Sequence, residues 1–416
     1  MKDDVALSRI FAVRALVIVI FVASLNPRAY LSSQELSHDV RVVNIAVPVR
    51  VFEGNRFVDN LTMRDFEVLE DGKPQKVEAV YVVNKTAVEP QILGTGPHPW
   101  SSRSFFLFFN LFEPDPQIQK ALLYFIENVL APADHLLVIT PRAFYDWTKE
   151  AKAGRGAKEL SAGLAKKIRK DILAGDAAYR AVIADLKRMA GLGGIDQQMS
   201  GVVEISDHST LESLGTADIE QFLMKYRADV DQLTALRTID EGKILDFARA
   251  MKKTPGQKFV FYFYQKEFIP LLDPRTLQRY SEDPFLYSLI TELTEVLNQR
   301  SSLDIGRLRN TFADAFINFN FLYLTKDPAG VPSIQIAEKR DISSVFKNVA
   351  AATGGLDASS ASAGYLMQQA ATASEHSYLL YYSPSNTVRD GKFRKIEVRV
   401  KNGDYRVSFM AGYFAN

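Results

Sequence analysis

The chain has 416 residues, of which 47% are hydrophobic and 24% are charged. This length allows two or three domains with their own cores, and the composition is that of a folded protein rather than a disordered one. The net charge of +1 gives no support for a nucleic-acid-binding protein, and the absence of cysteine excludes disulfides, thiol catalysis and cysteine-ligated metal sites.

Residues 1–33 have the pattern of a secretory signal peptide. A basic start precedes an apolar run from 15 to 25, which is too short for a comfortable membrane span. Small residues at Ser24 and Ser33 leave the cleavage site open. We therefore expect export to the periplasm or the extracellular space, with no transmembrane span after signal removal. The alternative is an amphipathic or core helix.

Residues 39–84 alternate hydrophobic and polar side chains with the period of a β-strand. Asp71-Gly72 between two such runs is a strong hairpin signal. About 45 residues of hairpins are too few for a stable β-sandwich, so we expect strands from elsewhere in the chain to complete this module. Strand patterns return from 376 to 416 and predict those strands. Segment 85–102, which contains prolines and glycines, predicts a linker.

Residues 103–356 predict an α/β domain with a doubly wound, mostly parallel sheet. The run from 105 to 109 is apolar without alternation, as in a central strand covered on both faces. A helical pattern and a second apolar strand at 135–140 follow it, which is the order of a doubly wound unit. The helical periodicity of about 150–253 predicts a helical insertion.

Two separate stretches resemble the signatures of bacterial VWFA-related proteins, which are exported proteins built around a von Willebrand factor type A domain. The first runs from Leu61 to Gln75 and contains Asp65, Phe66, Val68, Glu70, Asp71 and Gly72. The second comprises Tyr378 to Pro384, Asp390 to Arg394, and Gly412-Tyr413, and Thr353-Gly354-Gly355 also matches. The resemblance spans about residues 39–416. It implies a type A-like domain inserted between the two halves of a β module, with a role in binding proteins or surfaces.

The chain departs from that family at the metal ion-dependent adhesion site. In type A domains, the loop after the first strand carries Asp-x-Ser-x-Ser, whose oxygens help to hold a divalent cation. The corresponding residues here are Asn110, Phe112 and Pro114, and a later strand runs into Tyr264-Gln265. A hard cation needs oxygen ligands, normally with carboxylate charge. This degenerate site therefore predicts neither a metal nor another cofactor.

Ligands of doubly wound sheets bind beyond the carboxyl ends of the strands, so the loop after the first strand is the expected contact surface. The residues expected to bind a partner are Asn110, Phe112, Glu113, Tyr264 and Gln265. Phe112 would serve as an apolar anchor. The alternative is a hydrolase with an acidic site, for which Glu113, Asp115 and Asp273 are the available carboxylates.

Basic residues are in excess between 149 and 170. The candidates for a basic surface are Lys158, Lys166, Lys167, Arg169 and Lys170. An apolar stripe accompanies them, so the segment predicts an amphipathic helix with a basic outer face. This face is either only solvated or contacts anionic lipid, a cell-surface polymer or an acidic protein. Together the features favour an exported, non-enzymatic binding or scaffold protein of the bacterial envelope, whose partner is a protein or a cell-surface polymer.

Overall fold

The computed structural model is of mixed α/β class. The residues that it describes are 44–54, 56–84, 87–90, 102–148, 156–190, 216–272, 274–298, 302–325, 336–338 and 340–416. The expected signal peptide and most of the expected linker lie outside these residues.

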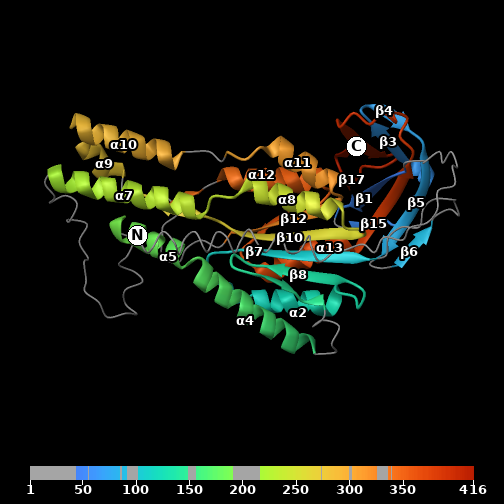
Figure 1. Cartoon of the computed structure of the whole chain (residues 1–416), viewed down its shortest axis with the longest axis horizontal. Coiled ribbons are helices and arrows are strands. Elements are labelled where there is room, and N and C mark those ends of the chain that lie inside the picture. Colours follow the sequence, from blue (N-terminus) through green and yellow to red (C-terminus); the bar gives the residue numbers. More distant parts are fainter. Residues whose placement is uncertain are drawn as a thin grey trace, which may run out of the picture. The chain divides into compact units, whose positions relative to one another are not determined.

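The central sheet has the strand order β14-β12-β10-β7-β8-β9 (Figure 1). Its strands are β7 (Arg103–Asn110), β8 (His135–Ile139), β9 (Phe144–Asp146), β10 (Gln257–Gln265), β12 (Ile317–Leu324) and β14 (Asp357–Ser360). Strand β9 is antiparallel to β8, and all other neighbours are parallel. The aromatic side chains of β7, β10 and β12 are mostly buried, because helices cover both faces of the sheet.

The direction of winding reverses between β7 and β10. Helices α2 (Ile118–Asn128), α4 (Ala157–Gly175) and α13 (Ala363–Glu375) pack on one face of the sheet. Helices α8 (Glu241–Lys252), α11 (Ile305–Asp314) and α12 (Arg340–Ala352) pack on the other. Strand β7 leads through α2 to β8, whereas β10 leads through α11 to β12 in the opposite direction. Such a reversal is the topological switch point, where doubly wound sheets bind ligands.

A further group of helices packs beyond the carboxyl ends of β7 and β10. It consists of α5 (Ala177–Met189), α7 (Thr216–Leu236), α9 (Pro274–Tyr280) and α10 (Pro284–Leu297), together with β11 (Phe268–Pro270) and β13 (Ile336–Glu338). The bounds of about 150–253 that the sequence predicted for a helical insertion in the α/β domain are wrong. Helices α4 and α8 pack on the central sheet instead, and the added helices come from two separate parts of the chain.

The β module is built from both ends of the described chain. One sheet has the order β17-β1-β15-β5-β6, with β2 paired to β1, and the other has the order β18-β16-β3-β4. The amino-terminal elements are β1 (Ile45–Glu53), β2 (Arg56–Phe57), η1 (Met63–Asp65), β3 (Phe66–Glu70), β4 (Lys73–Gln75), β5 (Val77–Asn84) and β6 (Ala87–Pro90). The carboxyl-terminal strands are β15 (His376–Tyr382), β16 (Phe393–Val400), β17 (Arg406–Phe409) and β18 (Gly412–Phe414). One hydrophobic core joins the two sheets. Strand β6 lies inside the segment that was expected to be a linker.

The two signature-like stretches contact each other in this module. Glu70 is 2% exposed and accepts hydrogen bonds from the hydroxyls of Tyr382 at 2.6 Å and Tyr413 at 3.0 Å. The hydroxyl of Tyr378 accepts a hydrogen bond from the backbone N–H of Leu61 at 3.0 Å. A buried carboxylate needs such donors. These residues therefore hold the two ends of the chain together.

Thr353-Gly354-Gly355 fixes the end of α12 to its neighbours. Thr353 Oγ1 accepts a hydrogen bond from the N–H of Phe319 in β12 at 3.1 Å. The carbonyl of Gly354 accepts one from Arg50 Nη1 in β1 at 2.7 Å. A Cβ atom on Gly355 would lie 1.8 Å from the carbonyl oxygen of Phe319, so this close approach requires glycine.

Candidate functional site

The switch point brings together the ends of β7 and β10 and the loop that leaves β7. Gln265 Oε1 accepts hydrogen bonds from the backbone N–H groups of Phe112 at 3.2 Å and Glu113 at 3.0 Å. Asn110 Nδ2 donates to the hydroxyl of Tyr262 at 2.9 Å. Side chains of β10 thus bind the end of β7 and the loop that follows it, at the position where a ligand would be expected.

A buried arginine lies against this edge of the sheet. Arg237 directly follows α7 and is 8% exposed. Its Nε atom donates to Glu267 Oε1 at 2.9 Å, and its Nη1 atom is 3.5 Å from Asp176 Oδ1. Burial alone would lower the pKa of Arg237, but the attraction of the surrounding groups, chiefly Glu267, raises it above its ordinary value. The guanidinium is therefore a permanent positive charge inside the protein.

Aromatic rings enclose the same guanidinium. Arg237 Cζ is 5.6 Å from the ring centroid of Phe112, 5.3 Å from that of Tyr179 and 5.8 Å from that of Tyr264. The Tyr264 hydroxyl donates to Glu267 Oε1 at 2.5 Å, and burial, followed by the Glu267 charge, raises the pKa of Tyr264. The site therefore combines one cation with two carboxylates and three aromatic rings.

The expectation that Phe112 is an exposed anchor is wrong. Its ring is 2% exposed, because residues of α5, α7 and α10 share a core with it. Tyr264 and Gln265 are each 2% exposed as well. Of the five expected contact residues, only Asn110 and Glu113 remain partly accessible.

The acidic alternative does not form a cluster within the described part of the chain. No group of three histidine, cysteine, aspartate or glutamate residues there could hold a metal ion. Asp115 Oδ1 accepts a hydrogen bond from the N–H of Gln117 at 2.7 Å and so serves the turn before α2. Asp273 lies outside the described residues.

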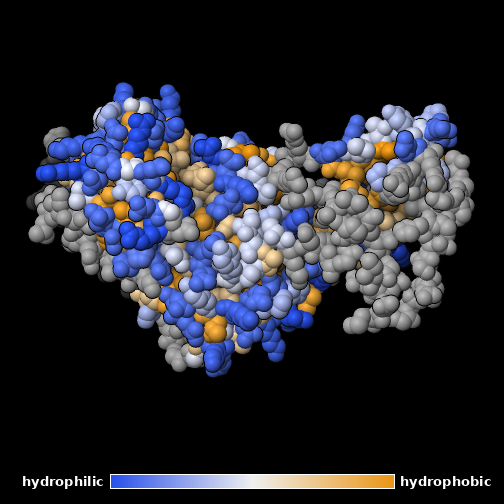
Figure 2. Space-filling model, turned by 180° about the vertical axis from the view of Figure 1, so that it is seen from behind, coloured by the Kyte–Doolittle hydropathy of each residue, from blue (hydrophilic) through white to orange (hydrophobic). Residues whose placement is uncertain are grey.

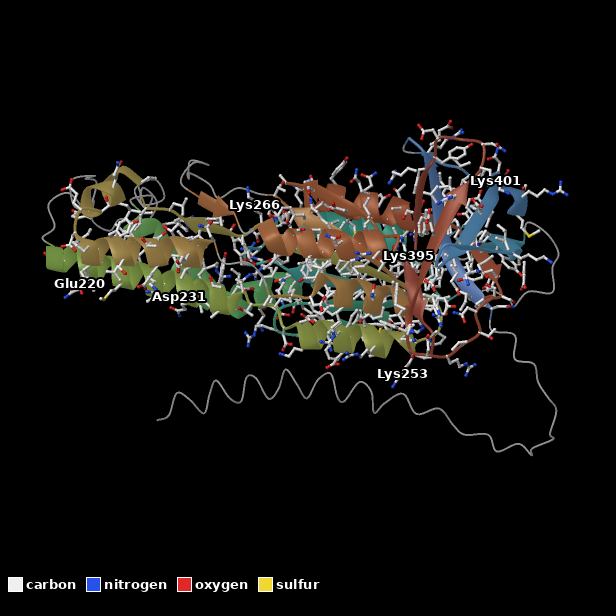
Figure 3. All side chains as sticks on the ribbon, turned by 90° about the horizontal axis from the view of Figure 1, so that it is seen from above. Glu220, Asp231, Lys253, Lys266, Lys395 and Lys401 are labelled. Carbon is white, nitrogen blue, oxygen red and sulfur yellow. The ribbon has the colours of Figure 1, made fainter. Side chains whose placement is uncertain are left out.

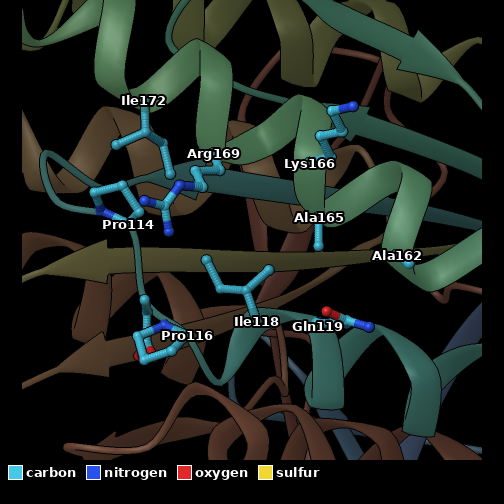
Figure 4. A pocket seen from close by; sticks show the side chains of 10 residues that line it. Pro114, Pro116, Ile118, Gln119, Ala162, Ala165, Lys166, Arg169 and Ile172 are labelled. Carbon is cyan, nitrogen blue, oxygen red and sulfur yellow. The ribbon is translucent and has the colours of Figure 1, made fainter.

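A pocket of about 230 Å³ lies between the same loop and α4 (Figure 4). It is lined by Pro114, Asp115, Pro116, Ile118, Gln119, Ala162, Ala165, Lys166, Arg169 and Ile172. The Arg169 guanidinium lies beside Pro114, whereas the Lys166 amine points away from Ile118. The pocket thus joins the loop after β7 to the basic surface of α4, two features that are separate in the sequence.

Helix α4 has the amphipathic character that its sequence predicts. Its apolar stripe, which includes Leu164 and Ile168, is buried against the sheet. The side chains of Lys158, Lys166, Arg169 and Lys170 are exposed and make no ion pair with any described residue. Lys167 differs, because its Nζ atom lies 5.0 Å from the ring centroid of Tyr145 and 5.1 Å from that of Trp147.

The face shown in Figure 2 is mostly hydrophilic, and its hydrophobic residues occur in small groups. Charged side chains line the outer surfaces of several elements, for example Glu220 and Asp231 on α7 and Lys395 on β16 (Figure 3). None of the described helices is long and apolar enough to cross a membrane. Comparison of the chain with family models, with curated proteins and with solved structures found no match.

Proposed function

We propose that this chain is an exported, non-enzymatic binding or scaffold protein of the bacterial envelope. Its α/β domain is type A-like and binds a protein or cell-surface partner without a divalent cation. One observation carries the proposal: the switch point is filled by the Arg237 guanidinium, the Phe112 ring and the Gln265 side chain.

The electrostatics of the switch point disfavour a metal ion there. Two carboxylates beside the switch point, Glu267 and Asp176, are engaged with Arg237. A divalent cation placed beside the guanidinium would be repelled, and this repulsion is strong in a buried, weakly screened position. Asn110 offers an amide without charge and is already bonded to Tyr262.

The type A-like assignment is supported by the winding reversal between β7 and β10 and by the signature-like residues. Those residues pair the two ends of the β module around an α/β domain. The resemblance to exported VWFA-related proteins supports the binding role and the envelope location. The partner must then contact a surface other than the filled switch point.

Capture from a bacterial envelope extract tests the proposal. The full chain is immobilised and incubated with extract in EDTA or in millimolar Mg²⁺, with beads carrying an unrelated protein as the control. We expect the same specific partner in both conditions. Capture that requires Mg²⁺ would overturn metal independence, and chemical conversion of the captured partner, seen by mass spectrometry, would overturn the non-enzymatic role.

A further inference from the structure

We infer that the pocket between residues 114–119 and α4 is the docking site for an acidic segment of a partner protein. A carboxylate of that segment pairs with Arg169, and Lys166 adds a second positive charge at the rim. This inference rests on the proposed binding function and assigns it a surface and a partner chemistry.

The first support is unpaired positive charge. Lys158, Lys166 and Arg169 lie on one side of α4, and none of them has a carboxylate partner within the described part of the chain. On α7, by contrast, Lys225 Nζ pairs with Asp229 at 2.8 Å. Charges left unpaired by the protein itself remain available to an anionic partner, and complementary charge favours association and selects the partner.

The second support is a preformed recess beside these charges. Its volume of about 230 Å³ exceeds the ~150 Å³ of an engineered cavity that holds benzene, so one side chain of a partner fits. Ala162 and Ala165 leave the α4 wall open, while Pro114 and Ile118 make the opposite wall apolar. Arg180 Nη1 ties the loop after β7 to α4 by donating to the carbonyl oxygens of Phe112 at 2.9 Å and of Ile172 at 3.1 Å.

The third support selects a peptide rather than a membrane surface. Asp115 shares the pocket with Arg169, and its buried Oδ2 atom receives no hydrogen bond from the described residues. This carboxylate disfavours a surface of repeated phosphates. A peptide supplies an acidic side chain for Arg169 without bringing a row of phosphates against Asp115. The small residues of the α4 wall also provide no apolar anchor of the kind that inserts into lipid.

Fluorescence anisotropy with the full chain and a labelled hexaglutamate peptide tests the inference. The double charge reversal Lys166→Glu and Arg169→Glu should weaken the peptide affinity by about tenfold or more, because the anion would meet like charges. Ala165→Trp retains both charges but fills the recess, and should also weaken binding. Lys253→Glu is the matched control, because this exposed lysine follows α8 on the opposite face of the sheet. It should leave the affinity within about twofold.

Thermal melts of each variant establish that it is folded before its affinity is compared. Equal affinity of all variants would overturn the docking site, and loss in the charge reversal without loss in Ala165→Trp would overturn the role of the recess. Binding to phosphatidylglycerol vesicles in preference to the peptide would overturn the peptide assignment. None of these outcomes bears on metal independence, which the EDTA comparison tests separately.

Discussion

At the residue scale, the burial of Arg237 has an unfavourable desolvation energy and a favourable interaction energy with its neighbours. Removing a guanidinium from water is costly, and the cost is offset here by Glu267, Asp176 and three aromatic rings. The guanidinium, its carboxylate partners and the rings together fill the switch point, and each of them needs the others to remain stable there. These groups come from four distant parts of the chain, so no local sequence pattern could have indicated the arrangement. Local patterns place Phe112 after a buried strand, but its burial depends on helices that arrive much later in the chain.

Replacing Arg237 by methionine should destabilise the fold by about 3–5 kcal/mol, because Glu267 would be left buried without its cation. The matched control is Arg227→Met in α7, the helix that Arg237 follows, since Arg227 pairs with Glu292 but its side chain is 37% exposed. That change should cost less than about 1 kcal/mol. Urea unfolding of both variants measures the difference. Equal losses in the free energy of unfolding would show that the burial of Arg237 does not make its ion pairs more important for stability.

The buried amine of Lys258 should make the stability of the fold depend on pH. Its Nζ atom donates to the carbonyls of Met251 at 3.1 Å and Thr254 at 3.0 Å, and burial lowers its pKa from 10.5 to about 8. Between these values the unfolded state binds more protons, so the contribution of Lys258 to stability rises with pH.

The free energy of unfolding of the wild type should therefore rise relative to Lys258→Met by about 2 kcal/mol between pH 8 and pH 9.5. Tyrosine ionisation cancels in this comparison, because both proteins carry the same tyrosines. Denaturation curves at several pH values make the measurement. Parallel pH profiles for the two proteins would contradict the lowered pKa.

At the element scale, continuous apolar runs predicted β7 and β8, because central strands are covered on both faces. The α/β class is confirmed, whereas the type A-like fold remains a proposal. Strand β14 was missed, because Asp357–Ser360 is short, polar and at the sheet edge. The sequence of helix α13 does carry helical signals: Ser362 accepts a capping hydrogen bond from the N–H of Tyr365, and Leu366, Met367 and Ala370 recur at helical spacing.

A side chain at Gly355, which follows α12, should lower the stability of the fold strongly. Gly355→Ala should cost about 3 kcal/mol, because the new Cβ would overlap the carbonyl oxygen of Phe319 and force the backbones apart. Gly364→Ala in α13 is the control. The nearest atom to a Cβ there is Ser362 Oγ at 3.7 Å, so this change should be neutral or slightly stabilising. Similar melting temperatures for the two variants would contradict the close approach.

On the scale of the whole molecule, the β module makes both ends of the described chain mutually dependent. Strand β15 lies between β1 and β5, and β16 pairs with β3. The pairing of early with late strands agrees with the sequence-based expectation, which rested on there being too few strands at either end. The pocket could not be predicted in this way. Its two walls follow different strands, and only the packing of α4 against α2 brings them together.

Export is a prediction about residues 1–33. Fused to a reporter that is active only outside the cytoplasm, this segment should produce activity, because it has the basic start and apolar run that translocation requires. A fusion in which two charged residues interrupt the apolar run is the control and should be inactive. Activity of the wild-type fusion no higher than that of a leaderless reporter would contradict export.

Thermal melting with divalent cations tests the central claim most directly. A cation bound to the folded state would add about 2.7 kcal/mol of stability at a hundredfold excess over its Kd, which is readily seen as a shift in Tm. Millimolar Mg²⁺, Ca²⁺ or Mn²⁺ should leave the Tm unchanged relative to EDTA, because Arg237 occupies the switch point as a fixed cation. A saturable rise in Tm that is abolished by Glu113→Ala or Asp115→Ala would contradict the account.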